Sequence, residues 1–336
     1  MSILITGGAG YIGSHVQKLL LKQSEDVIIV DSLVTGHKEA VLSDKFYQGD
    51  IRNREFMSKV FKENKIDAVI HFAASSLVGE SMQDPFKYYD NNLYGTACLL
   101  EEMRLNGVNK IVFSSTAATY GEPKNIPITE DDETNPTNAY GQTKLSMEKM
   151  MKWFDKAYGI KYIALRYFNA AGADTEGVLG EAHMTETHLI PLILQVPLGK
   201  REYISVFGND YDTIDGTCIR DYIHVEDLAS AHYLAVKSLL NGDESTVYNL
   251  GNGLGYSVSQ VIDAAKKVTG YDIKVKFEGR RAGDPAKLVA SSDGWYPVYE
   301  KGKKDPIAYT RLDKGDVYKI GESQKSSNRY SSTRMD

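Results

Sequence analysis

Short runs rich in Ile, Val and Phe recur through the first half of the chain, and longer stretches with a helical spacing of apolar residues lie between most of them. This alternation is typical of βαβ units and predicts a largely parallel sheet with helices on both faces. Strands are predicted at 2–6, 26–31, 45–50, 68–74, 110–116 and 162–168, and helices at 14–23, 54–65 and 92–107. We therefore predict a Rossmann-like, doubly wound α/β sheet, whose ligand crevice lies beyond the carboxyl ends of its strands.

The pattern loosens from about Gly172, where long Gly- and Asp-rich connections appear at 172–188 and 208–222. Connections of this length are usually retained for function. Two amphipathic helices (224–242 and 257–270) flank a strand at 246–251. We expect a smaller α/β lobe that is interleaved with the sheet domain. The predicted division gives residues 1–168 plus 222–252 to the sheet domain, 169–221 plus 253–300 to the lobe, and 301–336 to a loosely packed or disordered, Ser-rich tail.

The composition excludes several classes of protein. The chain has 336 residues, of which 42% are hydrophobic and 25% charged, as in ordinary soluble enzymes. A formal charge of −6 argues against a nucleic-acid binder, and no apolar run is long enough for a membrane helix. The two cysteines, Cys98 and Cys218, form neither a disulfide framework nor a metal-ligand spacing. With no secretory signal visible, we expect a cytoplasmic protein with no membrane partner.

A glycine-rich turn follows the first predicted strand and opens the first helix. Gly7, Gly10 and Gly13 lack Cβ atoms, so the backbone can approach a pyrophosphate that rests on the N–H groups of the helix N-terminus. Asp31 closes the second strand, 18 residues after Gly13. A carboxylate there binds the adenosine ribose hydroxyls and repels a 2′-phosphate. The sequence therefore predicts a dinucleotide site that prefers NAD to NADP.

Tyr140 and Lys144 are four residues apart near the start of a helix, and Thr116 ends the strand at 110–116. Such a pair also occurs by chance on helix surfaces, so the glycine turn decides the interpretation. A lysine ammonium and a positive nicotinamide ring both favour the tyrosine phenolate, which lowers a pKa that is normally about 10. Tyr140 is then predicted to act as a general base, and Thr116 to hold the reacting hydroxyl.

Three segments resemble the extended short-chain dehydrogenase/reductase superfamily: TGGAGYIG, SSTAATYG and YGQTK. Longer segments narrow the resemblance to UDP-glucose 4-epimerases of the Gram-positive bacterial type, over about residues 2–292. These are HFAASSLVGESMQDPFKYYDNNLYGT, LRYFNAAGA, FGNDYDTIDGTCIRDYIHVEDLA, YNLGNG and RRAGDPA. The resemblance implies that a UDP-hexose gives its C4 hydride to tightly bound NAD+, becomes a 4-keto sugar, turns over and receives the hydride on its other face.

The resemblance also implies the roles of individual residues. Tyr140 is the catalytic base, Lys144 binds the nicotinamide ribose, and Thr116 binds the sugar 4-hydroxyl. The cofactor-binding residues are Gly7, Gly10, Tyr11, Ile12, Gly13, Asp31, Asp50, Ile51, Phe72, Ala73, Ala74, Ser75, Asn92, Ser114, Tyr140, Lys144 and Tyr167. The substrate-binding residues are Thr116, Asn169, His188, Leu189, Val206, Phe207, Arg220, Arg281 and Asp284.

Three alternatives accompany this interpretation. Related 4,6-dehydratases place Asp-Glu directly after the active-site threonine, where this chain has Ala117 and Ala118, so dehydration is not expected. A non-catalytic NAD-binding sensor on the same fold has no need for Thr116, Tyr140 and Lys144 together. Another nucleotide-sugar epimerase, for UDP-N-acetylhexosamine or UDP-pentose, stays open because Leu288 stands where glucose-specific relatives usually carry a bulky Tyr.

Three further expectations concern metal, assembly and the C-terminus. His183 and His188 lie five residues apart, but we expect no metal because no Cys or carboxylate pattern completes a site; His224 is expected to cap a helix. The resemblance implies a homodimer built from helices at 93–106 and 141–158. After residue 292 the sequence departs from the resemblance and does not match the closing helices of relatives. We therefore expect lower stability of the protein and no change in its chemistry. A large loss of melting temperature in a variant ending at Glu300 would show that the tail packs after all.

Overall fold

A seven-stranded parallel sheet forms the centre of the computed structural model, which describes residues 1–281, 284–291, 295–299, 306–311, 318–320 and 332–334. The strands lie in the order β11 (Thr246–Leu250), β6 (Lys161–Tyr167), β5 (Lys110–Thr116), β4 (Ala68–His71), β1 (Ser2–Thr6), β2 (Asp26–Asp31) and β3 (Lys45–Gln48). All neighbouring pairs are parallel. The predicted fold class is confirmed.

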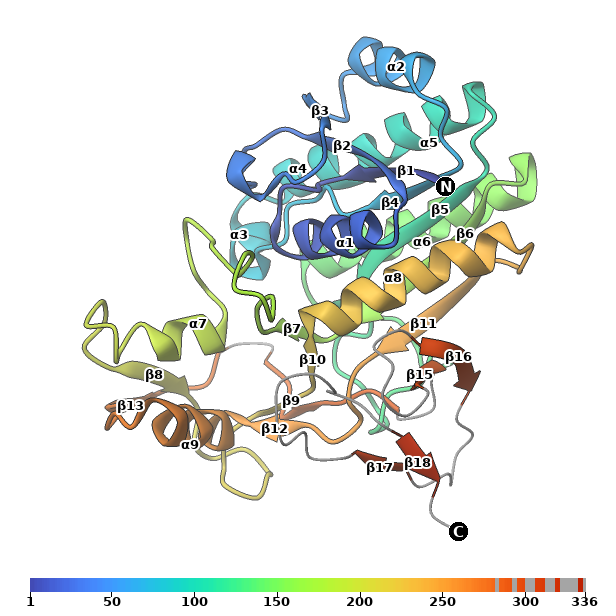
Figure 1. Cartoon of the computed structure of the whole chain (residues 1–336). Helices are drawn as coiled ribbons and strands as arrows, with labels where there is room; N and C mark the ends of the chain where they lie inside the picture. The colour runs from blue at the N-terminus through green and yellow to red at the C-terminus, as the bar shows by residue number, and fades with distance from the viewer. Residues whose placement is uncertain (282–283, 292–294, 300–305, 312–317, 321–331, 335–336) are drawn as a thin grey trace.

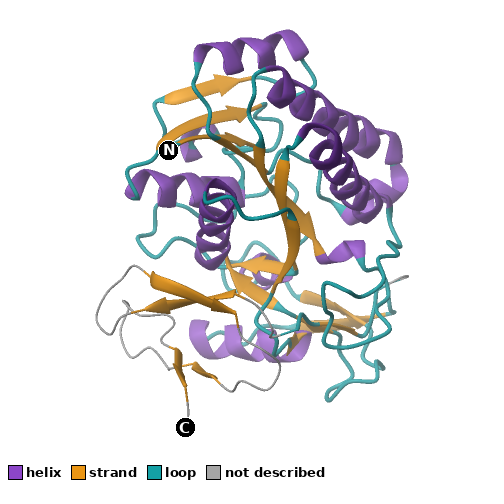
Figure 2. Ribbon diagram, turned by 90° about the vertical axis from the view of Figure 1, so that its right-hand side faces the viewer, coloured by secondary structure: helices purple, strands orange, loops and turns teal. Residues whose placement is uncertain are grey.

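Helices cover both faces of this sheet (Figures 1 and 2). One face packs against α1 (Tyr11–Lys22) and α8 (Val225–Leu240), and the other against α2 (Arg54–Glu63), α5 (Gly95–Leu105) and α6 (Ala139–Tyr158). Side chains alternate between the two faces: Ile3 and Ile5 join the core beneath α1 and α8, whereas Leu4 joins the core beneath α2, α5 and α6. Burial on both faces explains why the five inner strands are nearly continuous hydrophobic runs.

Most helix boundaries lie within two residues of the predicted ones, and the starts of two helices differ by more. Helix α1 begins at Tyr11, three residues before the predicted start, because Gly10 is already its N-cap. The predicted helix at 92–107 begins inside a π-helical turn, η2 (Tyr89–Tyr94), that continues into α5. Before this turn the chain forms α3 (Val78–Gln83) and α4 (Pro85–Tyr88); short 3₁₀ turns occur at η1 (Lys38–Ala40) and η3 (Ala117–Thr119). π-Helical turns inside helices are frequently found at functional sites.

The smaller lobe lies below the sheet in Figure 1 and is built from short elements. Strand β8 (Ile204–Phe207) pairs with β13 (Val275–Glu278), and β9 (Ile219–Arg220) lies between β12 (Tyr256–Ser257) and β14 (Lys287–Leu288). Helices α7 (Leu189–Leu194) and α9 (Val258–Thr269) close a core that includes Ile193, Val206, Cys218 and Ile262. Strands β7 (Asn169–Ala171) and β10 (Tyr222–His224) pair where the chain passes between the two parts.

The described parts of the C-terminal region form two antiparallel strand pairs: β15 (Trp295–Tyr299) with β16 (Pro306–Arg311), and β17 (Tyr318–Ile320) with β18 (Ser332–Arg334). The remainder of the predicted loose tail, 301–336, lies outside the described residues. Within the described part of the chain, no helix is both long and apolar enough to cross a membrane.

Candidate active site

The glycine turn at the end of β1 is closely packed by backbone. Gly7 has φ +78°, and a Cβ there would lie 2.6 Å from the Ala73 nitrogen; a Cβ on Gly13 would lie 2.3 Å from the Gly7 oxygen. Among the described residues no side chain caps the α1 N-terminus, and the first turn of α1 contains no acidic residue. A bare helix N-terminus of this kind fits the pyrophosphate of a dinucleotide.

Asp31 and Asp50, both predicted to bind the cofactor, differ in their surroundings. The Asp31 carboxylate is buried at the end of β2 and accepts hydrogen bonds from the backbone N–H groups of Ala9 (2.9 Å) and Leu33 (2.8 Å). Asp31 therefore joins the strand end to the glycine turn. The Asp50 carboxylate instead accepts from the side chain and backbone of Arg52, and the Arg52 side chain lowers the pKa of Asp50. Ile51 is buried in the core.

Helix α6 brings Tyr140 and Lys144 to the end of β5. Asn138 caps the helix, because its side-chain oxygen accepts from the Gly141 N–H at 2.8 Å. A Cβ on Gly141 would lie 2.5 Å from the Ala118 oxygen, so only glycine permits this close approach of the helix to the segment after β5. The Thr116 side chain is within hydrogen-bonding reach of the Tyr140 hydroxyl, and Lys144 Nζ lies 5.9 Å from the Tyr140 ring centroid. Lys144 Nζ also donates to the Ser114 carbonyl at 2.7 Å. The three predicted catalytic side chains thus lie together.

In the protein without cofactor, burial has the largest influence on the pKa values of Tyr140 and Lys144. Burial raises the pKa of Tyr140 to about 12, and the hydrogen bond with Thr116 opposes the rise. Burial likewise lowers the pKa of Lys144 to about 7, against the attraction of Glu148. The predicted lowering of the Tyr140 pKa counted both the Lys144 ammonium and the nicotinamide ring, and it stays a prediction for the protein with bound NAD; in the protein alone, both charged forms lose hydration. The phenolate needs further positive charge at the site.

Two more predicted cofactor residues hold this region together. Buried Asn92, in η2, accepts from the Ser75 N–H at 2.7 Å and donates to the Thr143 hydroxyl at 3.1 Å. It thereby joins the segment after β4 to α6, beside Lys144. The Tyr167 and Ser114 hydroxyls are 2.5 Å apart at the ends of β6 and β5. The segment from Phe72 to Ser75 follows β4 at the same edge of the sheet.

A buried ion pair behind Lys144 was missed in the sequence. Arg166 and Glu148 are 2.6 Å apart, and their side chains are only 7% and 6% exposed. Glu148 also accepts from the Ser115 hydroxyl, and Arg166 donates to the Tyr120 hydroxyl at 2.8 Å. The available signal was the position of Glu148, four residues after Lys144 and so on the same helix face.

The predicted nucleotide-binding residues gather in the lobe. Arg220, on β9, forms an ion pair with Asp284, and the Arg281 guanidinium lies 3.9 Å from the Phe207 ring centroid. Val206 is buried in the lobe core. Asn169, on β7, donates its backbone N–H to Asp221 at 3.0 Å.

Leu288 lies near the catalytic group. It packs against a small buried cluster of Ala117, Tyr120 and Ile128. Ala117 directly follows Thr116 in the chain. Ala118 donates its backbone N–H to the Thr116 hydroxyl at 3.1 Å. Positions 117 and 118 thus supply small side chains without acid or base chemistry next to the catalytic threonine.

The expectation that no carboxylates accompany His183 and His188 is wrong. The two histidines lie within 4.8 Å of two carboxylates, and we call these four residues the Glu–His cluster: Glu181, His183, Glu186 and His188. The hydrogen bond to Glu181 raises the pKa of both histidines. Burial favours the neutral form of Glu181, but the bonds from the two histidines prevail and lower its pKa to about 2. His188 is also the N-cap of α7, which Leu189 begins.

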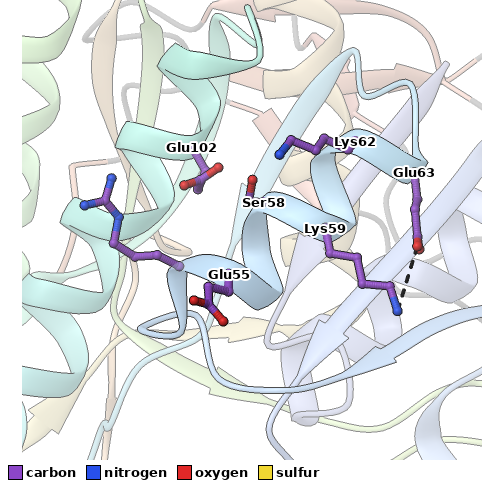
Figure 3. A pocket seen from close by; sticks show the side chains of 7 residues that line it. Glu55, Ser58, Lys59, Lys62, Glu63 and Glu102 are labelled. Atoms are coloured by element: carbon purple, nitrogen blue, oxygen red, sulfur yellow. Dashed lines mark ion pairs between the residues drawn. The ribbon is translucent and has the colours of Figure 1, made fainter.

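A surface depression of about 700 Å³ lies between α2 and α5 (Figure 3). Charged side chains line it, and Lys59 and Glu63 form an ion pair across 3.8 Å. None of the described residues that line it belongs to the predicted site.

Comparisons with known proteins agree with this geometry. The model of the NAD dependent epimerase/dehydratase family matches residues 3–251. The UDP-glucose 4-epimerase of Halalkalibacterium halodurans is 56% identical over 305 residues, covering 89% of this chain and 91% of that protein. A crystal structure of a UDP-glucose 4-epimerase is 57% identical with a TM-score of 0.85, covering 87% of this chain and 89% of that one. The UDP-glucose 4-epimerase from Bifidobacterium longum, in complex with NAD+ and UDP, is 42% identical with a TM-score of 0.80, covering 86% and 90%.

Proposed function

The chain belongs to the NAD dependent epimerase/dehydratase family, and we infer its reaction from this membership together with the side chains that meet at α6. It is an NAD-dependent enzyme that epimerises UDP-glucose at C4, as its curated relatives do. The resemblance to UDP-glucose 4-epimerases that the sequence predicted is confirmed. The observation that carries the inference is the meeting of Thr116, Tyr140 and Lys144 at the carboxyl end of β5.

The catalytic roles follow from the chemistry of these side chains. NAD+ bound here would supply both the acceptor and the donor for the C4 hydride, so no second substrate would be needed. The Tyr140 oxygen takes the proton of the 4-hydroxyl, and the Thr116 hydroxyl holds that group in line. Because burial disfavours the phenolate, Tyr140 depends on the Lys144 ammonium and the positive nicotinamide ring.

The lobe holds the nucleotide end of the substrate. Arg220 and Arg281 supply charge-assisted hydrogen bonds to the diphosphate, and the ion pair with Asp284 orients Arg220. Asn169, His188, Leu189, Val206 and Phe207 complete the proposed nucleotide site. A substrate that is anchored through its diphosphate leaves the hexose free to turn between the two hydride transfers.

The direct test incubates purified protein with UDP-galactose and, separately, with UDP-glucose, with no added reductant. NMR should show both reactions approaching one common ratio of the two sugars. A protein that carries NAD but converts neither sugar would instead support a non-catalytic sensor.

A second candidate substrate is an N-acetylated UDP-hexose. Leu288 packs beside Ala117, next to Thr116, and is smaller than the tyrosine of glucose-specific relatives. Leu288→Tyr should reduce turnover of UDP-N-acetylglucosamine about tenfold, the effect of a steric clash of 1–2 kcal/mol, and leave UDP-glucose turnover nearly unchanged. Equal turnover of the acetylated sugar by both proteins would argue against this role of Leu288.

We also propose a homodimer that forms through α5 and α6. Leu105, Trp153 and Tyr158 are exposed on these helices, and Arg104 lies over the Tyr158 ring at 5.4 Å. Light scattering should give twice the chain mass, and Trp153→Glu should reduce it to one chain. The domain division (1–168 plus 222–252, and 169–221 plus 253–300) and a cytoplasmic location stay predictions.

A further inference from the structure

We propose that the loop before α7 binds one divalent transition-metal ion of the zinc class through the four side chains of the Glu–His cluster. This proposal does not depend on the reaction that the enzyme catalyses, but it gives the His188 side chain to the ion and leaves only the His188 backbone for the proposed nucleotide site. It replaces the sequence-based expectation of no metal, which rested on a supposed lack of carboxylates near the two histidines.

The spacing of the donor atoms fits such an ion. His183 Nδ1 lies 3.3 Å from a Glu181 oxygen and 3.4 Å from a Glu186 oxygen. Two ligands of a tetrahedral zinc ion, each about 2.0–2.1 Å from the metal, are about 3.4 Å apart. His188 Nδ1 is closer, at 2.9 Å and 2.8 Å from the same two carboxylates. All four donor atoms lie within 4.8 Å of one another, and His188, the most exposed of the four side chains, has room to adjust toward the tetrahedral spacing.

The carboxylates are held ready for a cation. The backbone N–H groups of Thr187 and His188 both donate to Glu186 Oε1 at 2.8 Å, which leaves Oε2 directed toward His183. The side chains of Glu181 and Glu186 are each only 9% exposed, whereas that of His188 is 44% exposed. Both carboxylates are already paired with the two histidines, and a divalent ion would replace these bonds. The two carboxylates would balance its charge once the imidazoles release their protons to bind it. His188 leaves an open approach from solvent.

The position of the cluster defines what the ion would do. Tyr11, the first residue of α1, donates its hydroxyl to the Gly172 carbonyl at 2.6 Å, and its ring lies edge-on to His183 at 6.3 Å. A ring nitrogen of His37 lies 2.5 Å from the Ala182 oxygen. The cluster thus lies between the glycine turn and α7. Four protein ligands are typical of closed, structural zinc sites. The ion would therefore fix residues 181–188 between the cofactor turn and the nucleotide lobe.

The test uses the full-length protein, stripped with a chelator and dialysed against metal-free buffer. Titration with zinc chloride in competition with a chromophoric chelator gives the affinity, and mass spectrometry of the metal after gel filtration gives the stoichiometry. We expect about one zinc ion per chain. His183→Ala and Glu181→Gln should each weaken binding at least about tenfold. Met184→Ala, a matched control at an 87% exposed position of the same loop, should bind like the unsubstituted protein.

Folding controls keep the result interpretable. Circular dichroism and the amount of bound NAD should be the same in all variants. Glu181→Gln keeps the shape of the side chain, which an alanine would remove. A protein that takes up no zinc above background, or a His183→Ala variant that binds as tightly as Met184→Ala, would overturn the proposal.

Thermal unfolding tests the structural role. Saturating zinc should raise the melting temperature of the stripped protein by several degrees, and should leave that of His183→Ala nearly unchanged. An equal rise in both proteins would place the ion elsewhere and overturn the assignment. Zinc that binds at the cluster without raising the melting temperature would overturn its role in holding the loop.

Discussion

Regular secondary structure holds the catalytic side chains in the sheet half of the molecule, whereas loops and very short strands hold the proposed nucleotide-binding side chains in the lobe. Lys144 is buried on a 20-residue helix that packs on two central strands. Arg281 is exposed and rests on the Phe207 ring, and His188 ends a long loop. The difference matches the tasks of the two halves: hydride transfer needs fixed geometry, and nucleotide capture needs a surface that can adapt.

The largest effect should come from Tyr140→Phe, which removes one oxygen from the rigid half. We expect kcat to fall about 10²- to 10⁴-fold with NAD still bound, because the general base is lost and the packing is not. Tyr256→Phe, which removes the same atom from an exposed lobe residue, is the control and should keep kcat near its original value. A Tyr140→Phe enzyme within about threefold of the original would remove Tyr140 from the mechanism.

Breaking an ion pair should lower the free energy of unfolding more in the sheet half than in the lobe. Glu148→Gln leaves the Arg166 guanidinium buried without its carboxylate, which should lower the free energy of unfolding by about 3–5 kcal/mol. The lobe offers a matched pair, Arg280 and Asp210, whose side chains are both exposed. Asp210→Asn should unfold in urea at nearly the same concentration as the unsubstituted protein. Similar losses in the two variants would contradict this distinction.

Buried histidines should make the sheet half sensitive to acid. Burial lowers the pKa of His232 to about 4, from about 6.5 in an unfolded chain. The unfolded state therefore binds more protons between these values, and the free energy of unfolding decreases as the pH falls from about 6.5 to 4. The decrease amounts to about 3 kcal/mol for this one group.

His232→Asn removes the titrating ring and keeps a donor for the Leu228 carbonyl, which His232 contacts at 2.7 Å. Urea unfolding between pH 4 and pH 7.5 should therefore show a flatter stability profile in this variant. His71, whose pKa burial lowers to about 3, stays in both proteins and keeps part of the slope. Parallel profiles would rule out His232 as a source of the acid sensitivity.

The smallest effect should come from the exposed lobe. Arg281→Gln removes one charged hydrogen-bond donor from the proposed diphosphate site and should raise KM about tenfold with kcat nearly constant. Arg201→Gln, at another exposed arginine of the lobe, should leave both constants unchanged. A fall in kcat with an unchanged KM would mean that Arg281 acts on the reacting sugar instead.

The contrast between the regular sheet half and the irregular lobe also explains which parts of the structure the sequence could predict. The five inner sheet strands could be predicted because burial on both faces produces hydrophobic runs, and the glycine turn and the Tyr140–Lys144 pair have fixed spacings. The lobe strands β9, β12 and β14 have only two residues each and carry no periodic signal. The Glu–His cluster depends on how a loop turns, which spacing alone does not reveal. The raised pKa of Tyr140 depends on burial by residues distant in the sequence.

The central claim is that the C4 hydrogen leaves the sugar as a hydride, is kept within the active site and returns to the opposite face. UDP-galactose carrying deuterium at C4 tests it when turned over in ordinary water, with the UDP-glucose product examined by NMR and mass spectrometry. The account predicts that the product retains the deuterium at C4. Replacement of the deuterium by hydrogen from water would show that a proton leaves instead, and would contradict the roles proposed for Tyr140, Lys144 and Thr116.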